Sequence, residues 1–255
     1  MKIAILVHKL VRSGTQRQAL CLARECMRRG HTVTVYAASY IPDPSCKELI
    51  EGIKIVSLAD HRRALPKKKP FIQRPRALVA FIRQRKASKL LAQLIDPDTD
   101  ILNPHAHSYI TAAFFKRTIK HIPSVWMMND MPLHSWALWK ESQLNLHASG
   151  QWLRRLLYAV LDWWKRYYIA AQDAIVVLDN MNEGFVRHYL KRPALVVRSG
   201  LDLEQFSYVP RDTYHGGEIR ILMTGIFAVH RRFEDVLRRW TYCIVRQDVA
   251  SVLLL

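Results

Sequence analysis

The chain has 255 residues, half of them hydrophobic, and carries a formal net charge of +18 at pH 7. Such a composition excludes a disordered chain and predicts a packed core, in one large domain or in one domain and part of another. No segment reaches the roughly 20 consecutive apolar residues of a membrane span, and the excess positive charge predicts an anionic partner: a membrane surface, a nucleic acid or a phosphorylated substrate.

The first segment of the chain predicts a βαβ unit. Residues 2–7 form a continuous apolar run typical of a buried parallel strand, and residues 31–36 form the next strand. Between them, residues 16–29 carry apolar side chains at i, i+3, i+4, i+7 and i+8, which lie on one face of a helix, and Gly30 ends that helix. A right-handed crossover makes the two strands parallel.

The same alternation of strand and helix continues along the chain. Strands are expected at residues 53–58, 100–103, 124–128, 174–178 and 195–197, with helices at 77–95, 109–120, 151–171 and 181–190. This order predicts a doubly wound α/β domain with a parallel sheet. Ligands of such sheets bind at the carboxyl ends of the strands, so the loops there are the candidate sites.

A cluster of proline, glycine and aspartate around residues 208–217 predicts a domain boundary. We expect residues 1–212 to form an N-terminal Rossmann-like domain. Residues 213–255 then begin a second domain, with a strand at 218–225 and a helix at 233–246. The sequence stops within an apolar run of strand type at 251–255, so we expect this second domain to be incomplete.

Several polar residues follow the predicted strands. Gly14 and Thr15 precede the first helix, whose free N–H groups suit an anion, although an ordinary strand-to-helix turn explains them equally well. His107 comes after the strand at 100–103, where a hydrogen-bonding role in a polar cleft is favoured over a metal. Asn129 and Asp130 end the next strand, and Asp130 is either a base or a helix cap. The four cysteines have no CxxC spacing, which indicates reduced thiols of a cytosolic protein and no metal site.

Two segments suggest contact with a membrane surface. Residues 61–90 contain 11 lysines or arginines and no acid, which favours an anionic surface as partner. The residues expected to bind it are Lys67, Lys68, Lys69, Arg74, Arg76, Arg83 and Arg85. The helix at 151–171 is rich in tryptophan and tyrosine, as an interfacial helix is, but we favour a core helix with one solvated stripe of charges.

Five segments, in order, resemble glycosyltransferase family 4, whose members are retaining sugar transferases of the GT-B fold. Their sequences are RGHTVTV at 29–35, DILNPHAHS at 100–108, AIVVLDNMN at 174–182, VVRSGLDLEQF at 196–206 and ILMTGIFAVHRRFEDV at 221–236. The fourth segment is the most specific match, to the family's "vipnGvDlerF". The resemblance implies two similar Rossmann-like domains with the donor between them.

The resemblance also implies an activity and its residues. A sugar passes from a nucleotide-diphosphate sugar to a glycan, a lipid-linked acceptor or a small molecule, with retention of configuration and usually without a metal or other cofactor. The donor and its phosphates would contact Gly14, Thr15, Gly200, Gly225, Arg231 and Arg232. The catalytic candidates are His107, Asn129 and Asp130.

Departures from the family pattern limit this expectation. The sequence ends before the position of the family's paired glutamates in the second domain. Ile226 and Phe227 stand where an arginine is usual, and Asn129 stands where a histidine is common. We therefore expect little or no activity from the chain as written. The alternative is a non-catalytic remnant that binds anionic membrane through the basic segment, and nucleic-acid binding ranks last because no such module has its signature here. The expected location is cytoplasmic, peripheral to the inner face of the membrane.

Overall fold

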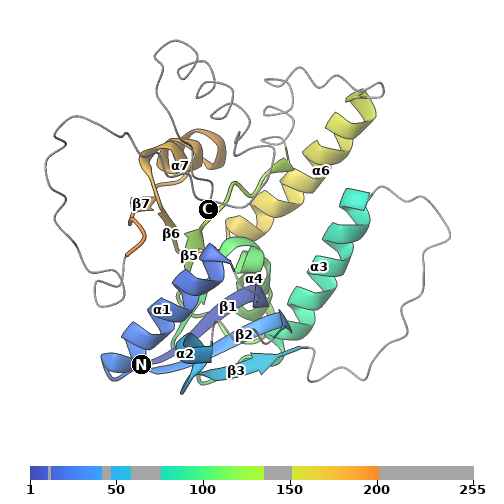
Figure 1. Cartoon of the computed structure of the whole chain (residues 1–255). Coiled ribbons are helices and arrows are strands. Elements are labelled where there is room, and N and C mark those ends of the chain that lie inside the picture. Colours follow the sequence, from blue (N-terminus) through green and yellow to red (C-terminus); the bar gives the residue numbers. More distant parts are fainter. Residues whose placement is uncertain (11–12, 42–46, 59–75, 135–150, 201–255) are drawn as a thin grey trace, which may run out of the picture. The chain divides into compact units, whose positions relative to one another are not determined.

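Parallel strands form the centre of the described structure (Figure 1). The computed structural model describes residues 1–10, 13–41, 47–58, 76–134 and 151–200. Four strands have the order β3-β2-β1-β4, namely β1 (Lys2–Leu10), β2 (Thr32–Tyr40), β3 (Lys54–Ser57) and β4 (Ile101–Pro104). Three more have the order β5-β6-β7, namely β5 (Val125–Met128), β6 (Ala174–Val177) and β7 (Leu195–Val196). Each predicted strand within the described residues is confirmed.

The two sets of strands meet where β4 lies beside β5. Isolated parallel bridges pair Leu102 with Ser124 and His105 with Met127. The side-chain amide of Asn103 also donates a hydrogen bond of 2.8 Å to the carbonyl of Val125. Through this junction the strands follow the order 3-2-1-4-5-6-7, which is the doubly wound arrangement predicted from the sequence.

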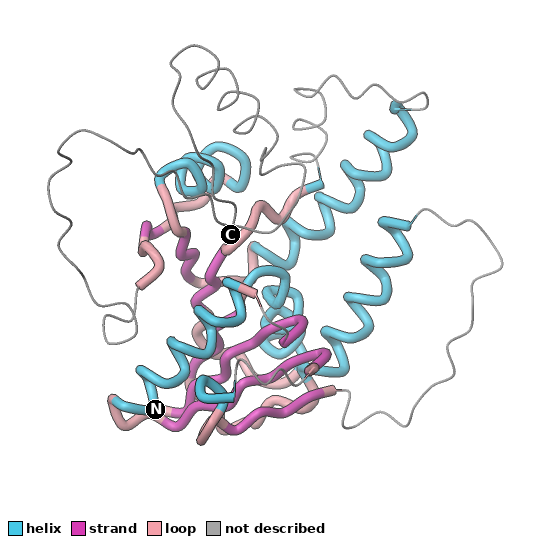
Figure 2. Tube along the Cα trace, in the orientation of Figure 1, coloured by secondary structure: helices cyan, strands magenta, loops and turns pink. Residues whose placement is uncertain are grey.

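Helices connect successive strands, as Figure 2 shows in cyan. They are α1 (Gly14–Arg28), α2 (Lys47–Ile50), α3 (Arg76–Ala92), α4 (Tyr109–Thr118), α6 (Gln151–Ile169) and α7 (Asn180–Phe185), with short turns η2 (Ala106–Ser108) and η3 (Val186–Leu190). Gly30 follows α1 with φ 81°, a left-handed conformation that suits glycine at a helix end. At the start of α7, the carboxylate of Asp179 accepts a hydrogen bond of 2.7 Å from the backbone N–H of Asn182. The short helix α2 was not predicted.

Both faces of the first half of the sheet are buried. Ile5 and Val7 of β1 pack in one cluster with Leu20 of α1. The alternate residues Ala4 and Leu6 point to the other face, where their cluster contains residues of α3 and α4. Burial on both faces explains why β1 is apolar without alternation.

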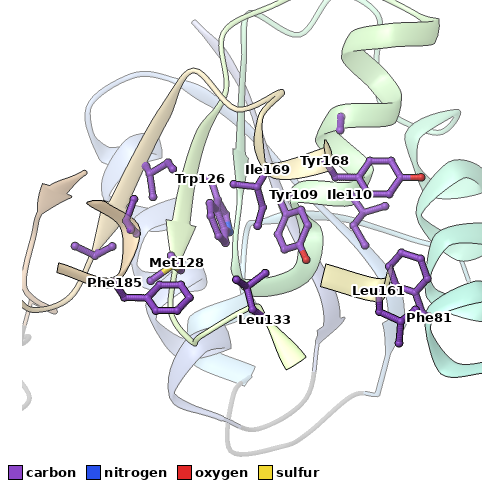
Figure 3. Packing of buried hydrophobic residues seen from close by; sticks show 14 residues of the cluster. Phe81, Tyr109, Ile110, Trp126, Met128, Leu133, Leu161, Tyr168, Ile169 and Phe185 are labelled. Carbon is purple, nitrogen blue, oxygen red and sulfur yellow. The ribbon is translucent and has the colours of Figure 1, made fainter. Parts of the chain in front are cut away.

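The second half of the sheet has its own aromatic core, shown in Figure 3. Trp126 of β5 is fully buried, and its ring lies edge-on to that of Tyr109, with the centroids 5.0 Å apart. Leu161 and Tyr168 bring α6 into the same cluster. The helix α6 is therefore a packed element of the domain.

The predicted solvated stripe of charges on α6 is confirmed only for Arg155 and Arg166, which are exposed. Asp162 and Lys165 are each only 5% exposed, whereas Trp152 and Trp163 are 73% and 63% exposed. The charged pair is accommodated inside because the Asp162 carboxylate accepts a hydrogen bond of 2.6 Å from the backbone N–H of His134, and the Lys165 ammonium donates to the carbonyl of Pro132. Of the aromatic residues of α6, Trp152, Trp163 and Tyr167 face outward, whereas Tyr168 packs in the core.

A partly buried ion pair holds α4 against the strands β5 and β6. The ammonium of Lys116, in the last turn of α4, donates to Oδ2 of Asp173 and to the carbonyl of Ala171, the latter at 2.8 Å. The same carboxylate accepts a 2.7 Å hydrogen bond from the backbone N–H of Ser124, just before β5. One carboxylate thus joins a helix end to the starts of two strands.

We expect Asp173→Ala to lower the free energy of unfolding by about 2 kcal/mol, because it leaves the buried Lys116 ammonium without its carboxylate. The matched control is Asp98→Ala, which removes the partner of Lys2 in an ion pair whose side chains are 49% and 76% exposed. That change should cost less than about 0.5 kcal/mol. Urea unfolding of both variants measures the difference, and equal losses would contradict this role for Asp173.

Candidate functional site

Three loops at the carboxyl edge of the sheet are joined by hydrogen bonds of two side chains, Gln18 of α1 and Asn129 after β5. The amide nitrogen of Gln18 donates to the hydroxyl of Ser199 at 3.3 Å, and its carbonyl oxygen accepts from the side-chain amide of Asn129. The oxygen of Asn129 in turn accepts a hydrogen bond of 3.3 Å from the backbone N–H of Ala106. The loops after β4, β5 and β7 therefore meet at the first turns of α1.

The start of α1 is open at this edge. Gly14 is exposed, and a Cβ built on it would meet no atom of the described residues within 4 Å. The first turn, which includes Thr15, contains no acidic residue, and the N-cap Ser13 makes no capping hydrogen bond with its side chain. The N-terminus of this helix is thus a partial positive charge that can receive an anion.

A strained turn follows β4. Ala106 has φ 47°, which is uncommon for alanine and is held here by hydrogen bonds on both sides. Its N–H donates to Asn129, and its carbonyl accepts a 2.8 Å hydrogen bond from Nε1 of Trp126. This conformation places His105 and His107 on either side of the turn.

The two histidines have different surroundings. His105 is 1% exposed and its Nε2 lies 2.8 Å from Oδ1 of Asn103, an acceptor, so Nε2 carries the proton. Burial lowers the pKa of His105 to about 4. His107 instead lines a cavity, so it is the one that can touch a ligand.

This cavity has a volume of about 290 Å³ and lies between α3, α6 and the turns after β4 and β5. Its lining comprises Ala77, Ala80, Phe81, Gln84, His107, Met131, Pro132, Leu133, His134 and Lys165. The walls from α3 and residues 131–133 are mainly apolar. The polar groups are one amide, two imidazoles and one ammonium.

Burial governs the electrostatics of the cavity. It lowers the pKa of Lys165 to about 8, against the opposing effect of Asp162. Burial, together with the positive charge of Lys165, also lowers the pKa of His107 to about 4. The pKa of His134 is lowered for the same two reasons, and its ring stacks on Tyr158 with the centroids 4.8 Å apart.

The sequence-predicted residues divide into three groups. Gly14, Thr15, Asn129 and Gly200, the residue after Ser199, belong to segments that Gln18 brings together, and the exposed Asp130 adjoins Asn129. Arg83 is exposed on α3, which Arg76 begins. The remaining predicted residues lie outside the described part of the chain, as does the predicted second domain. They are Gly225, Arg231, Arg232, Lys67, Lys68, Lys69 and Arg74.

Arg85, predicted to bind a membrane, has partners within the described part of the protein. Its Nε donates a 2.7 Å hydrogen bond to the hydroxyl of Tyr168. Its guanidinium lies over the rings of Trp164 and Phe114, 5.2 and 5.9 Å from their centroids. Arg85 therefore joins α3 to α6 and α4.

Sequence reasoning missed His134 and Lys165. For Lys165 a signal existed, because Leu161, Lys165 and Tyr168 have the i, i+4, i+7 spacing of one helix face. A lysine on an apolar face is a candidate buried cation. For His134 the sequence gives no such signal, because His134 lies outside α6 and no residue spacing relates it to Lys165.

Among the described residues no group of three metal-ligating side chains occurs. A doubly wound parallel sheet with polar residues at its carboxyl edge defines a ligand-binding α/β protein of the Rossmann type. The family model described as Glycosyltransferase Family 4 matches residues 12–205. The chain belongs to this family, which confirms the resemblance seen in the sequence.

Comparison with curated proteins gave no match, and comparison with solved structures gave distant similarities. MurG of Acinetobacter baumannii is 12% identical, with a TM-score of 0.40, over 77% of this chain and 44% of its own. A glycosyltransferase from Rickettsia africae is 14% identical, with a TM-score of 0.44, over 99% and 50%. Sucrose-phosphate synthase of Thermosynechococcus elongatus is 12% identical, with a TM-score of 0.44, over 81% and 93%. The chain thus spans about half the length of the first two.

We expect the free energy of unfolding to fall as the pH decreases from 6.5 toward about 4. In the folded state the pKa values of His105 and His107 lie near 4, below the ordinary 6.5, so the unfolded state binds more protons in this interval. Urea unfolding at several pH values measures the slope. His107→Gln should reduce this slope, and a slope equal to that of the unmodified protein would contradict the effect.

Proposed function

We propose that the protein transfers a sugar from a nucleotide-diphosphate sugar to a glycan, lipid-linked or small-molecule acceptor, with retention of configuration. The family match over residues 12–205 carries this proposal, because that range includes the whole carboxyl edge described above. The open N-terminus of α1 and the loops joined by Gln18 support the same location.

The roles follow from the charge that develops in the reaction. The leaving nucleotide diphosphate gains negative charge, and fixed dipoles and cations stabilise it. We assign this to the N–H groups at Gly14 and Thr15, to Gly200, and to Gly225, Arg231 and Arg232 farther along the chain. The acceptor oxygen bonds to the anomeric carbon as the bond to the diphosphate breaks. Asp130 would take the acceptor proton, while Asn129 and His107 would orient sugar and acceptor.

Gly14→Ala tests the donor site without disturbing the fold. The added methyl group meets no atom of the part of the chain that the structure describes, so thermal stability should be unchanged or slightly higher. The methyl group would, however, obstruct a phosphate that contacts the helix N-terminus, and we expect the Kd for uridine or guanosine diphosphate to rise at least about tenfold, a loss of about 1.4 kcal/mol.

The matched control is Gly184→Ala in α7, where a Cβ also meets no atom within 4 Å. Calorimetric titration of both variants should show weaker binding for Gly14→Ala alone. A double change of Arg231 and Arg232 to alanine should remove the remaining affinity. Unchanged nucleotide affinity in all of these variants would refute the assignment of the donor site.

A second function, peripheral binding to an anionic membrane at its inner face, is favoured by the outer face of α6. Trp152, Leu156, Val160, Trp163 and Tyr167 lie along one side of this helix and are 49–73% exposed. Arg155 and Arg166 of the same helix are also exposed. No helix among the described residues is long and apolar enough to cross a bilayer. An exposed aromatic stripe beside basic residues suits the interface between headgroups and acyl chains.

We expect the protein to sediment with vesicles of phosphatidylcholine and phosphatidylglycerol, and Trp152→Ser with Trp163→Ser to reduce the bound fraction several-fold. Both side chains are exposed, so the fold should tolerate the change. The matched control is Trp126→Phe inside the core, which should keep vesicle binding. Changing Lys67, Lys68 and Lys69 to glutamate tests the basic segment separately. Undiminished binding of both surface variants would exclude this membrane surface.

A further inference from the structure

The cavity between α3 and α6 combines an apolar wall with a cluster of basic groups, of which Lys165 and His134 have no part in the proposed transfer reaction. Ala77, Ala80 and Phe81 of α3 provide much of the apolar wall, and Met131 and Leu133 also line the cavity. Lys165, His134 and His107 come from three separate segments and line the same space. Such a cavity offers both a surface for hydrocarbon and a place for negative charge.

Lys165 is the buried cation of the cavity. It is 5% exposed, and its ammonium donates to the carbonyl of Pro132. A carbonyl contributes only a dipole to a buried cation, and an ammonium has three N–H donors. Asp162, one helical turn earlier, also accepts the hydrogen bond from the backbone of His134. The Asp162 carboxylate therefore both accepts this hydrogen bond and attracts the Lys165 ammonium.

The balance of charge around Lys165 favours a further anion. The loss of solvation outweighs the attraction of Asp162, which is why the pKa of Lys165 is lowered to about 8. His107 and His134 add imidazole groups, which can donate hydrogen bonds to a ligand. They contribute no negative charge to the cavity. A bound oxyanion would add negative charge close to the buried ammonium.

We propose that this cavity binds an oxyanion, phosphate or carboxylate, that is carried on an apolar group. The oxyanion would contact Lys165, His134 and His107, and the apolar group would lie along Ala77, Ala80 and Phe81. Binding itself is independent of the transfer reaction. The further assignment of this ligand as the charged, apolar end of the sugar acceptor rests on the proposed function.

The position of the cavity supports that assignment. His107 lines it, and the neighbouring Ala106 donates its N–H to Asn129 at the carboxyl edge. A ligand held against Lys165 would thus reach the turn that borders the candidate donor site. A hydroxyl on the same molecule could be presented to the reacting sugar.

The test is calorimetric titration of the full chain with hexyl phosphate, hexanoate, inorganic phosphate and the neutral hexyl glucoside. We expect the two amphiphilic anions to bind, the glucoside not to bind, and inorganic phosphate to bind at least about tenfold more weakly than hexyl phosphate. Equal affinity for the glucoside would overturn the role of the charge. Equal affinity for inorganic phosphate would overturn the role of the apolar wall.

Two variants separate the parts of the site. Lys165→Met should raise the Kd for hexyl phosphate at least tenfold, whereas Lys86→Met, on the exposed side of α3, should leave it unchanged. Ala80→Leu should fill the cavity and weaken binding without changing any charge, which keeps the test valid if Lys165→Met fails to fold. Unchanged affinity in a folded Lys165→Met or in Ala80→Leu would refute the proposal.

Binding of an amphiphilic anion in the cavity and binding of a nucleotide at the carboxyl edge can be tested separately. Lys165→Met should retain its affinity for nucleoside diphosphates, because the donor is assigned to the start of α1. Binding of hexyl phosphate without any binding of nucleotide would leave the cavity as an amphiphile site and remove its assignment to an acceptor.

Discussion

The junction between β4 and β5 is the contact on which the rest of the domain depends. It joins the two sets of strands through the parallel bridges and through the hydrogen bond from Asn103 to the Val125 carbonyl. Trp126 extends it by donating to the carbonyl of Ala106, which fixes the left-handed turn after β4. The network of Gln18 and the cavity beside Lys165 both draw residues from the two halves. Neither would exist if the halves were separated.

Both candidate sites arise from polar groups that the fold accommodates at some cost. The ammonium of Lys165 and the imidazole of His105 are buried, and burial disfavours the charged form of each. Meanwhile α6 leaves Trp152 and Trp163 in solvent. A helix optimised for stability alone would bury the aromatic side and expose the charges. The buried Asp162 and Lys165 and the exposed tryptophans are consistent with a domain that uses its interior for anions and its outer face for apolar contact.

Much of the fold could be predicted from the sequence, because a doubly wound sheet buries strands on both faces and yields apolar runs such as that of β1. The carboxyl-edge loops followed from the same pattern. The orientation of α6 could not be read correctly, since the helix has apolar residues on two sides and only packing of Leu161 and Tyr168 decides between them. The cavity was also missed, because it joins Phe81, His107, His134 and Lys165, which are far apart in sequence. Pattern and spacing report on local structure, whereas such a site is created by topology.

We propose that a nucleotide-diphosphate sugar binds at the carboxyl edge of this sheet. Hydrogen–deuterium exchange with mass spectrometry, with and without a saturating panel of uridine- and guanosine-diphosphate sugars, tests this binding site. We expect slower exchange in residues 13–18 and in the turns at 104–108 and 129–134, with the strands unchanged. Exchange that is unaltered by every donor, or protection confined to segments away from this edge, would contradict it.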